Sequence, residues 1–433
     1  MRKSICSLVA TAVFATIAVL PAAFASSAPQ WKPVLYHLPA DGVSASSLGV
    51  IPDDQNRHLN HDVTAVLQKA IFTLRPGQTL LLSPGLYHIS ATIRVPSGVS
   101  LQGQQDNSGA ILSFIVQTKP LGTWTPGKLG KGVLMNENYD ASTIMDKNIT
   151  VTAVGFEDQS FGIVFRMTQD VRIQGCRFNS GGDGVAFLAS HRTMVIDSFT
   201  ANTRNAAYDY WDGDVDSTIE NSVAVLAGGY GISFNAMDTD GTGRIATNLS
   251  AINNVISGAG NNTPAIYVNP LGGGSKITGT VTISNNKITS PQANVRTGGI
   301  YVVDGDANVV DVQGNYVSGS KFYQPIFVGG NRKSDGYVNP GRPVKTWITN
   351  NIVEHNVING GSGAVISADG ERVYVSRNTM RFNVSEKGDA MPFLQSSGHV
   401  YSWDNRIDGG GDIARSYKVL PNNLTLHAPP AGQ

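Results

Sequence analysis

The chain contains little cysteine, charge or histidine. Its 433 residues include two cysteines, eight histidines and 15% charged residues, with 32 basic residues against 32 acidic ones. Cys6 lies in an N-terminal apolar stretch, so Cys176 alone remains for the rest of the chain and cannot form an internal disulfide. The balanced charge gives no sign of a nucleic-acid-binding protein. A buried core, and not cross-linking, therefore has to stabilise the fold.

No segment has the length and apolar character of a stable membrane span. Residues 5–20 are mostly apolar, follow Arg2 and Lys3, and precede the small-x-small sequence "AFA" at 23–25. This order is typical of a secretory signal peptide. We expect a signal peptide over 1–25 with cleavage after Ala25, export to the periplasm or the medium, and an N-terminal arm over 26–60.

The most abundant feature is a repeat of short alternating segments. "VRIQGCRF", "MVIDSFTA" and "STIENSVA" begin at residues 171, 194 and 217, and the theme returns several times up to residue 407. Each copy reads as two short strands with a bend between them. A unit this short cannot bury its own apolar face, so neighbouring units have to stack. The sequence predicts an all-β fold, a single right-handed parallel β-helix over 148–420 with a tail over 421–433.

Polar residues recur at the bend of each repeat. The residues placed there are Asn221, Asn286, Asn315, Asn351, Asn378 and Asn405. Asparagine tolerates the left-handed backbone of a tight bend, and stacked asparagines can hydrogen-bond along the array. Cys176 and Ser198 occupy the same place in their repeats, so we expect Cys176 to be a buried turn residue without catalytic function.

The N-terminal part of the predicted solenoid differs from the repeats. Apolar residues at helical spacing over 63–74, with Asp62 as N-cap, predict a helix that covers the open end of the stack. This capping helix and the first coil occupy 61–104. Residues 105–147 break the rhythm and are rich in Pro, Gly and Lys, which predicts a long inserted loop. The loop is either a plain surface excursion or the wall of a groove.

The strings "DVTAVLQKAI", "SPGLYHI" and "TIRVPSGVSLQG" between 62 and 103 resemble the N-terminal cap of the pectate-lyase-like β-helix superfamily. That superfamily includes pectate lyases, polygalacturonases, alginate lyases and epimerases, and phage tailspike depolymerases. The resemblance implies the fold and a polysaccharide partner, while one fold hosts many reactions. The polygalacturonase strings "NTD", "GHG" and "RIK" and the epimerase string "DPHD" do not occur here.

A second strand in each repeat lets side chains be assigned to the inside or the outside. If Tyr208 and Tyr210 point inward, alternation places the neighbouring side chains on the outer surface. The outward stripe then contains Asp209, Trp211, Asn235, Tyr267, Asn269, Tyr301 and Phe327. Rings and amides in a row suit a sugar chain, and we predict substrate binding there together with Arg332. Alternatively, the inserted loop or a neighbouring subunit covers the stripe.

The stretch "YDYWDGDVDS", residues 208–217, concentrates four aspartates. Calcium prefers several carboxylate oxygens, and Asp212, Asp214, Asp216 and Asp238 could supply them. The resemblance implies that such a cation neutralises a uronate, so that a base removes the C5 proton and β-elimination follows. The candidate bases are His191, Arg244, Lys276 and Arg296. The alternative is that Asp and Gly serve only as turn residues.

Two further functions remain open at this point. Paired carboxylates such as Asp209 with Asp212, or Asp214 with Asp238, could hydrolyse a glycosidic bond as general acid and base. A solenoid with the same stripe could also bind a glycan without any chemistry. The sequence favours a polysaccharide lyase that acts on an acidic glycan, with a glycoside hydrolase and a non-catalytic binding protein as alternatives.

Overall fold

The computed structural model describes residues 31–53, 61–121, 131–141, 143–236, 244–260, 263–270, 274–290, 297–303, 306–322, 324–329, 342–358, 364–385 and 393–408. The predicted signal segment and C-terminal tail lie outside these residues. Residues 33–433 form one compact unit, which contains all the elements described below. No helix within the described residues is long and apolar enough to span a membrane.

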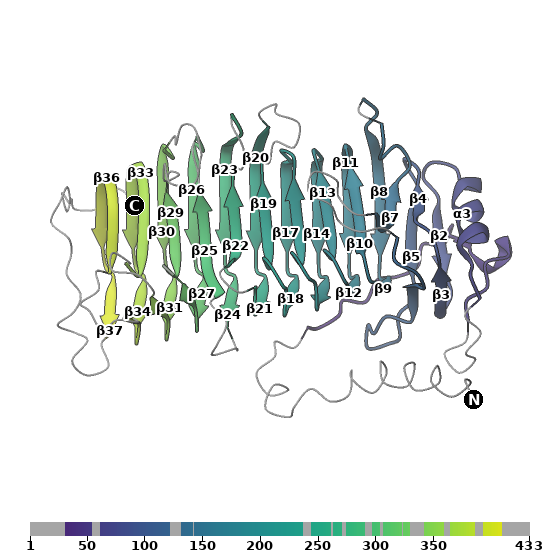
Figure 1. The fold of residues 1–433 in the computed structure, drawn as a ribbon, viewed down its shortest axis with the longest axis horizontal. Helices are drawn as coiled ribbons and strands as arrows, with labels where there is room; N and C mark the ends of the chain where they lie inside the picture. Colours follow the sequence, from purple (N-terminus) through teal and green to yellow (C-terminus); the bar gives the residue numbers. More distant parts are fainter. Residues whose placement is uncertain are drawn as a thin grey trace, which may run out of the picture. The chain divides into compact units, whose positions relative to one another are not determined.

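The unit is a stack of parallel strands (Figure 1). Each coil passes through three faces, and every strand pairs in parallel with the strands of the coils before and after it. Face 1 contains β4 (Ile93–Val95), β7 (Gly132–Asn136), β10 (Phe161–Arg166), β13 (Val185–Leu188), β16 (Tyr208–Trp211), β19 (Ile232–Asn235), β22 (Thr263–Asn269), β25 (Thr297–Val303) and β29 (Ile326–Gly329).

Face 2 follows face 1 after a short turn in each coil. It contains β1 (Val43–Ser44), β2 (Thr79–Leu82), β5 (Ser100–Gly103), β8 (Asp146–Thr152), β11 (Thr168–Gln174), β14 (His191–Ile196), β17 (Val215–Glu220), β20 (Ile245–Ile252), β23 (Lys276–Ser284), β26 (Val309–Gln313) and β30 (Lys345–Thr349). The long strands β33 (Ile366–Ser376) and β36 (Leu394–Trp403) run through both faces and join them into one sheet of 22 strands.

Face 3 is a separate sheet of 12 strands. It contains β3 (Gly85–Ile89), β6 (Ser113–Gln117), β9 (Gly155–Glu157), β12 (Arg177–Asn179), β15 (Phe199–Ala201), β18 (Val223–Val225), β21 (Val255–Ser257), β24 (Lys287–Thr289), β27 (Tyr316–Ser318), β31 (Ile352–Glu354), β34 (Thr379–Arg381) and β37 (Arg406–Asp408). A small third sheet contains β28 (Lys321–Phe322), β32 (Val357–Ile358) and β35 (Val384–Ser385).

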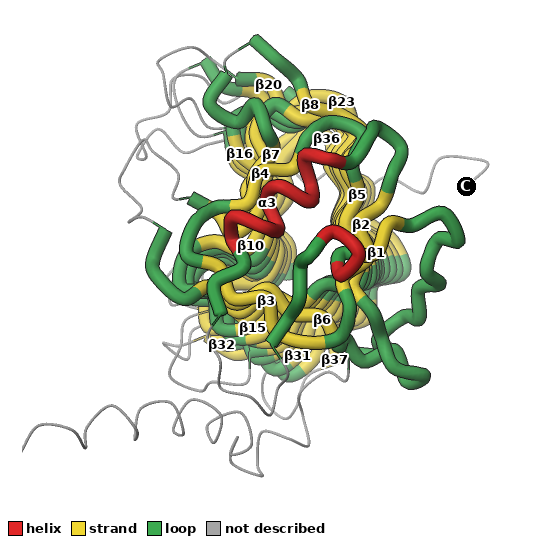
Figure 2. Tube along the Cα trace, turned by 90° about the vertical axis from the view of Figure 1, so that its right-hand side faces the viewer, coloured by secondary structure: helices red, strands yellow, loops and turns green. Residues whose placement is uncertain are grey.

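Seen from the end, the strands surround a central axis (Figure 2), and their buried apolar side chains form one core cluster. On face 1, Val185, Tyr208, Ile232 and Ile266 are in register and buried, as the predicted alternation requires. Rings extend this order along the axis, with the Phe187 and Tyr210 centroids 5.2 Å apart. The sequence prediction of a parallel β solenoid is therefore confirmed.

A ladder of side chains runs along the corner between faces 2 and 3. Asn315 receives hydrogen bonds from Asn286 and donates from its own backbone N–H and Nδ2 to Asn351 Oδ1, at 2.9 and 3.0 Å. The same pattern runs from Asn254 to Asn405. The prediction for Asn221 was displaced by one residue. Asn221 has the left-handed φ of 50°, and Ser222 occupies the ladder position.

Cys176 is a buried member of this corner, as predicted. Its backbone N–H donates to Ser198 Oγ at 3.2 Å, and burial raises the pKa of its thiol to about 12. A thiol with such a pKa stays protonated at neutral pH and is a poor nucleophile. Cys176 therefore contributes to packing.

The predicted N-terminal helix corresponds to α3 (Thr64–Thr73), preceded by the 3-10 turn η1 (Ser46–Leu48). Leu67 and Ile71 join the core, and Gln68 hydrogen-bonds to both the backbone N–H and the carbonyl of Arg94 in β4. Asp62 accepts the Thr64 N–H at 2.9 Å, one residue before the N-cap position.

The interpretation of residues 105–147 as one inserted loop needs correction. The described parts of this segment contain β6 on face 3, β7 on face 1 and the start of β8 on face 2. "SFIVQ" and "GVLMN" have the apolar content of buried strands, so β6 and β7 are regular strands of face 3 and face 1.

Candidate functional site

The four aspartates of "YDYWDGDVDS" lie in four different environments. Asp209 belongs to β16 on face 1, and Asp212 lies in the turn between faces 1 and 2. Asp214 is buried inside that corner, whereas Asp216 is exposed on β17. The left-handed φ values of Asp212 (65°) and Gly213 (85°) turn the chain sharply, so alternate residues no longer share a direction.

Asp214 continues a polar ladder inside the corner between faces 1 and 2. Thr168 donates to Ser190 Oγ at 3.0 Å, and the Ser190 N–H donates to Asp214 Oδ1 at 2.7 Å. Burial raises the pKa of Asp214 well above its ordinary value. A carboxyl group thus occupies the place that a hydroxyl takes in the preceding coils. Asp214 is a corner residue and not a ligand on the surface.

Asp216 belongs to an exposed column with a left-handed backbone. Asp170, Arg192, Asp216 and Asn248 have φ values between 49° and 57° on successive coils. Asn248 Nδ2 donates to Asp216 Oδ1 at 2.8 Å, and Arg192 makes a bidentate ion pair with Asp170. Turn chemistry accounts for Asp216, because Asp and Asn adopt this conformation at low cost.

The predicted calcium ligands do not converge in the described part of the chain. Asp212 Oδ1 lies 3.7 Å from Arg244 Nε, while Asp214 and Asp216 point elsewhere. The described residues contain no group of three or more His, Cys, Asp or Glu side chains that could hold a metal ion. Asp238, the fourth predicted ligand, lies outside the described residues.

Asp209 and Asp183, which lies two residues before β13, are buried carboxyl groups whose charges interact, and we call them the carboxyl pair. Both side chains have 0% exposure. Burial is the main cause that raises the pKa of Asp209 well above its usual range, and the neighbouring Asp183 raises it further. Burial also raises the pKa of Asp183 to about 7. Both shifts have the same physical cause, since a buried carboxyl group loses the hydration that stabilises its ionised form.

Hydrogen bonds fix the Asp209 carboxyl from the following coil and from its own strand. Ser233 Oγ donates to Asp209 Oδ1, and the Trp211 indole N–H donates to Oδ2. Asn235 Nδ2 donates to Ser233 Oγ at 2.9 Å and reaches Asp209 Oδ1 at 3.4 Å. No described residue hydrogen-bonds to Asn235 Oδ1 or Asp183 Oδ2, although both atoms are buried. The surroundings of Asp209 therefore combine a carboxyl group of raised pKa with buried acceptor atoms that no described residue uses.

An apolar cluster lies on the N-terminal side of Asp209, where Ala186 is in register with it. Met135, Phe161, Val164, Ala186 and Leu188 pack together on the outer side of face 1, with Trp211 and Tyr139 against them. The cluster lowers the local polarity, and this desolvation disfavours ionised carboxyl groups.

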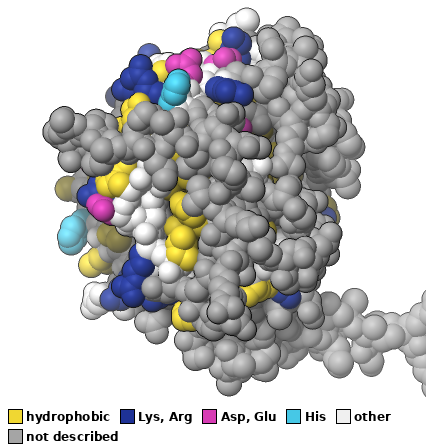
Figure 3. Space-filling model, turned by 90° about the vertical axis from the view of Figure 1, so that its left-hand side faces the viewer, with side chains coloured by type: hydrophobic (Ala, Val, Ile, Leu, Met, Phe, Trp, Pro, Cys, Tyr) yellow, Lys and Arg dark blue, Asp and Glu magenta, His cyan; other side chains and the backbone are white. Residues whose placement is uncertain are grey.

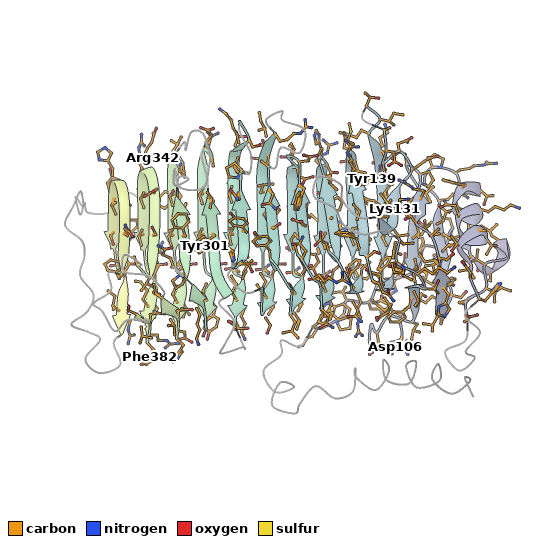
Figure 4. All side chains as sticks on the ribbon, viewed as in Figure 1. Asp106, Lys131, Tyr139, Tyr301, Arg342 and Phe382 are labelled. Atoms are coloured by element: carbon orange, nitrogen blue, oxygen red, sulfur yellow. The ribbon has the colours of Figure 1, made fainter. Side chains whose placement is uncertain are left out.

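The stripe that the sequence places outward does lie on one side of face 1, but most of it is withdrawn from solvent. Asn235 and Asn269 are at most 3% exposed, and Tyr301 (labelled in Figure 4) is 9% exposed. Tyr301 and Phe327 stack with centroids 5.1 Å apart, and Tyr230 stacks on Tyr267 at 5.0 Å. The expectation of an exposed stripe is thus wrong for Asp209, Asn235, Asn269 and Tyr301, whereas Trp211, Tyr267 and Phe327 are partly exposed. Alternation sets the face of a side chain and not whether other residues cover it.

Two further predicted residues, His191 and Lys276, begin strands of face 2 and not of face 1. His191 begins β14 on face 2, where it is in register with Val215. Lys276 forms an ion pair with Asp306 at 3.3 Å. Arg296 and Arg332 lie outside the described residues.

Asp183 is the member of the site that the sequence analysis missed. It lies in "SGGDGVAF", in the corner between faces 3 and 1, and its Oδ1 accepts the Ala206 N–H at 2.8 Å. Strand alternation does not reach corner residues. One signal for Asp183 was available in the sequence. It is a charged residue between glycines, just before a fully apolar strand, in a chain with few charges.

Comparisons with known proteins identify the architecture. No protein-family model and no curated protein matches the chain. Among solved structures it is similar to a mutant DFA-IIIase from Arthrobacter chlorophenolicus A6 in complex with DFA-III, at 12% identity and a TM-score of 0.56, over 91% of this chain and 100% of that one. It is also similar to PfbA, a surface adhesin of Streptococcus pneumoniae, at 13% identity and a TM-score of 0.55, over 86% and 91%. At 13% identity or less, these similarities show the fold alone, a parallel β solenoid.

Proposed function

We propose that the protein is a carbohydrate-active enzyme that hydrolyses glycosidic bonds at face 1, with Asp209 as the proton donor. The observation that carries this proposal is the full burial of the Asp209 carboxyl group on face 1, which together with the neighbouring Asp183 raises the pKa of Asp209 well above its usual range. Hydrolases of glycosidic bonds need one carboxyl group with a raised pKa and a second carboxylate.

In the proposed reaction, Asp209 transfers its proton to the glycosidic oxygen as the bond from this oxygen to the anomeric carbon breaks. Asp212, at the edge of face 1 beside Arg244, is the second carboxylate. It either stabilises the positive charge on the sugar ring or takes the proton of the attacking water. Asp209 has no exposed surface, so substrate binding has to open a path to it past Trp211, which is only partly buried.

A polysaccharide is the substrate class that fits the surroundings of the pair. Trp211, Tyr267 and Phe327 are partly exposed on the outer side of face 1. Exposed rings in a row suit contact with a sugar chain. The similar DFA-IIIase was solved in complex with DFA-III, and this supports a saccharide ligand for the fold.

The hydrolase fits the geometry better than the lyase that the sequence favoured. β-Elimination needs a base and a cation that neutralises the uronate, whereas carboxyl groups that retain protons are donors. Arg244 and Lys276, two of the candidate bases, lie beside Asp212 and Asp306. A calcium-dependent lyase would need ligands beyond the described residues, such as Asp238.

We also infer that the protein is exported and that helix α3 covers the N-terminal end of the strand stack. The segment over 1–25 has the order of a signal peptide, and a polysaccharide substrate is most accessible outside the cell. Helix α3 packs on β4 at the first coils and would shield the exposed strand edges of the stack (Figure 2).

The test is a screen of the protein against acidic and neutral polysaccharides, with and without EDTA. We expect new reducing ends without ultraviolet absorbance, unchanged by EDTA, lost in Asp209→Asn and retained in the control Asp216→Asn. An unsaturated product that disappears on chelation would instead identify a calcium-dependent lyase. Glycan binding without new reducing ends and without ultraviolet absorbance would identify a binding protein.

A further inference from the structure

The outer side of face 2 carries an ordered array of side chains at its C-terminal end. Strands β30, β33 and β36 are in register there, and residues two positions apart point to the same side. The nine residues of this C-terminal array are Lys345, Trp347, Thr349, Arg372, Tyr374, Ser376, His399, Tyr401 and Trp403. The array lies on face 2 and is therefore separate from the carboxyl pair on face 1.

The middle row of the array is a stack of three rings. Trp347 and Tyr374 have centroids 3.9 Å apart with planes at 12°, and Tyr374 and Tyr401 have centroids 5.0 Å apart, also at 12°. Parallel rings in contact at about 3.5–4.0 Å must be offset sideways when their centroids are 5.0 Å apart. The result is a stepped, rigid surface in which Tyr374 is buried and the two outer rings are partly open.

The row beside the rings is basic. Lys345, Arg372 and His399 are in register, and the last two are exposed. In the view onto this end of the coils, basic, acidic and histidine side chains lie near apolar ones (Figure 3). The acids that adjoin the array in sequence or register are Glu371, which precedes Arg372, Asp404, which follows Trp403, and Asp311, which is in register with Trp347. Burial raises the pKa of Asp311, which reduces its opposing charge.

We propose that the C-terminal array is a non-catalytic binding site for an acidic polysaccharide. The basic side chains repeat with the strand spacing of about 4.8 Å, so a chain of anionic sugars along the axis meets several of them. Ring edges carry partial positive charge and add to the attraction for carboxylate groups. Single-stranded nucleic acid fits less well, because bases stack on open ring faces, and here the ring faces are paired with one another.

The experiment measures binding by affinity electrophoresis in gels that contain polygalacturonate, dextran or no polymer. The Asp209→Asn background keeps the probe intact if face 1 degrades it. Two variants remove parts of the array, Lys345→Gln with Arg372→Gln for charge and Tyr401→Ala for the stack. The control Arg172→Gln with Lys287→Gln removes the same net charge from exposed residues far from the array.

We expect polygalacturonate, and not dextran, to retard the protein. Removal of the two charges should lower the affinity about tenfold, and this difference should shrink in added salt. Tyr401→Ala should weaken binding several-fold, and the control should bind like the parent. No retardation of the parent, or equal losses in array and control variants, would overturn the proposal. Tighter binding of an oligonucleotide, or a change of oligomeric state in Tyr401→Ala, would assign the array to nucleic acid or to a second copy.

Discussion

The corner between faces 2 and 3 and the outer side of face 1 bury polar side chains in opposite ways. Along the corner, Asn286, Asn315 and Asn351 repeat one set of hydrogen bonds from coil to coil. On face 1, Asp209 interrupts an apolar surface, and buried acceptor atoms nearby lack partners within the described residues. A polar residue that repeats is a structural element of the solenoid, whereas one that occurs once needs a different reason.

The largest effect on activity is expected from substitution of Asp209. Asparagine keeps the shape of the side chain but cannot donate a proton from oxygen, so Asp209→Asn should lower the hydrolysis rate by about 10²–10⁴-fold. Reducing ends released per unit time measure the effect. Asp216→Asn, in the exposed column, should change the rate and the stability very little. Equal rates for the two variants would remove Asp209 from the site.

The next prediction concerns the ladder. Asn351→Ala removes the acceptor for Asn315 and the donor to Asn378 and leaves buried groups unpaired. The free energy of unfolding should fall by about 2–4 kcal/mol, as measured by denaturant titration. Asn350→Gly is the matched control, because Asn350 is exposed with a φ of 57°, which glycine also adopts. A ladder variant as stable as its control would show that the ladder carries little energy.

The fold could be predicted in more detail than the site. Alternation with a period of two assigned Val185, Tyr208 and Ile232 to the core, because it depends only on strand geometry. Asp212 and Asp214 could not be placed in this way, since two left-handed residues redirect the chain between them. Nor does a pattern of alternation say whether an outward residue such as Asn269 is covered.

A smaller effect is expected in the pH dependence of stability. Burial raises the pKa of Asp214, so the folded state holds a proton that the unfolded state loses above about pH 4. Its contribution to stability is complete below that pH and declines as the pH rises toward the folded-state pKa, by at most about 1.4 kcal/mol per pH unit. Thermal unfolding from pH 4 to 8 should therefore show a shallower decline in Asp214→Asn than in the parent. A decline of equal steepness would contradict the assigned protonation.

The smallest expected effect distinguishes the functions of Asp183 and Asp209 in the carboxyl pair. Asp183 raises the pKa of Asp209, so Asp183→Asn should lower the Asp209 pKa and move the alkaline limb of the pH–rate profile to lower pH. The rate at acidic pH should change less than in Asp209→Asn. An unchanged limb, with the same loss at every pH, would mean that Asp183 acts only through packing.

The protonation of Asp209 at neutral pH is the central claim, and infrared difference spectroscopy tests it without a substrate. The spectrum of the parent at pH 7 minus that of Asp209→Asn should contain the carbonyl band of a protonated carboxyl group, and this band should shift in D₂O. A difference spectrum with only carboxylate bands would show that Asp209 is ionised at neutral pH, and it would remove the proton donor from the proposed mechanism.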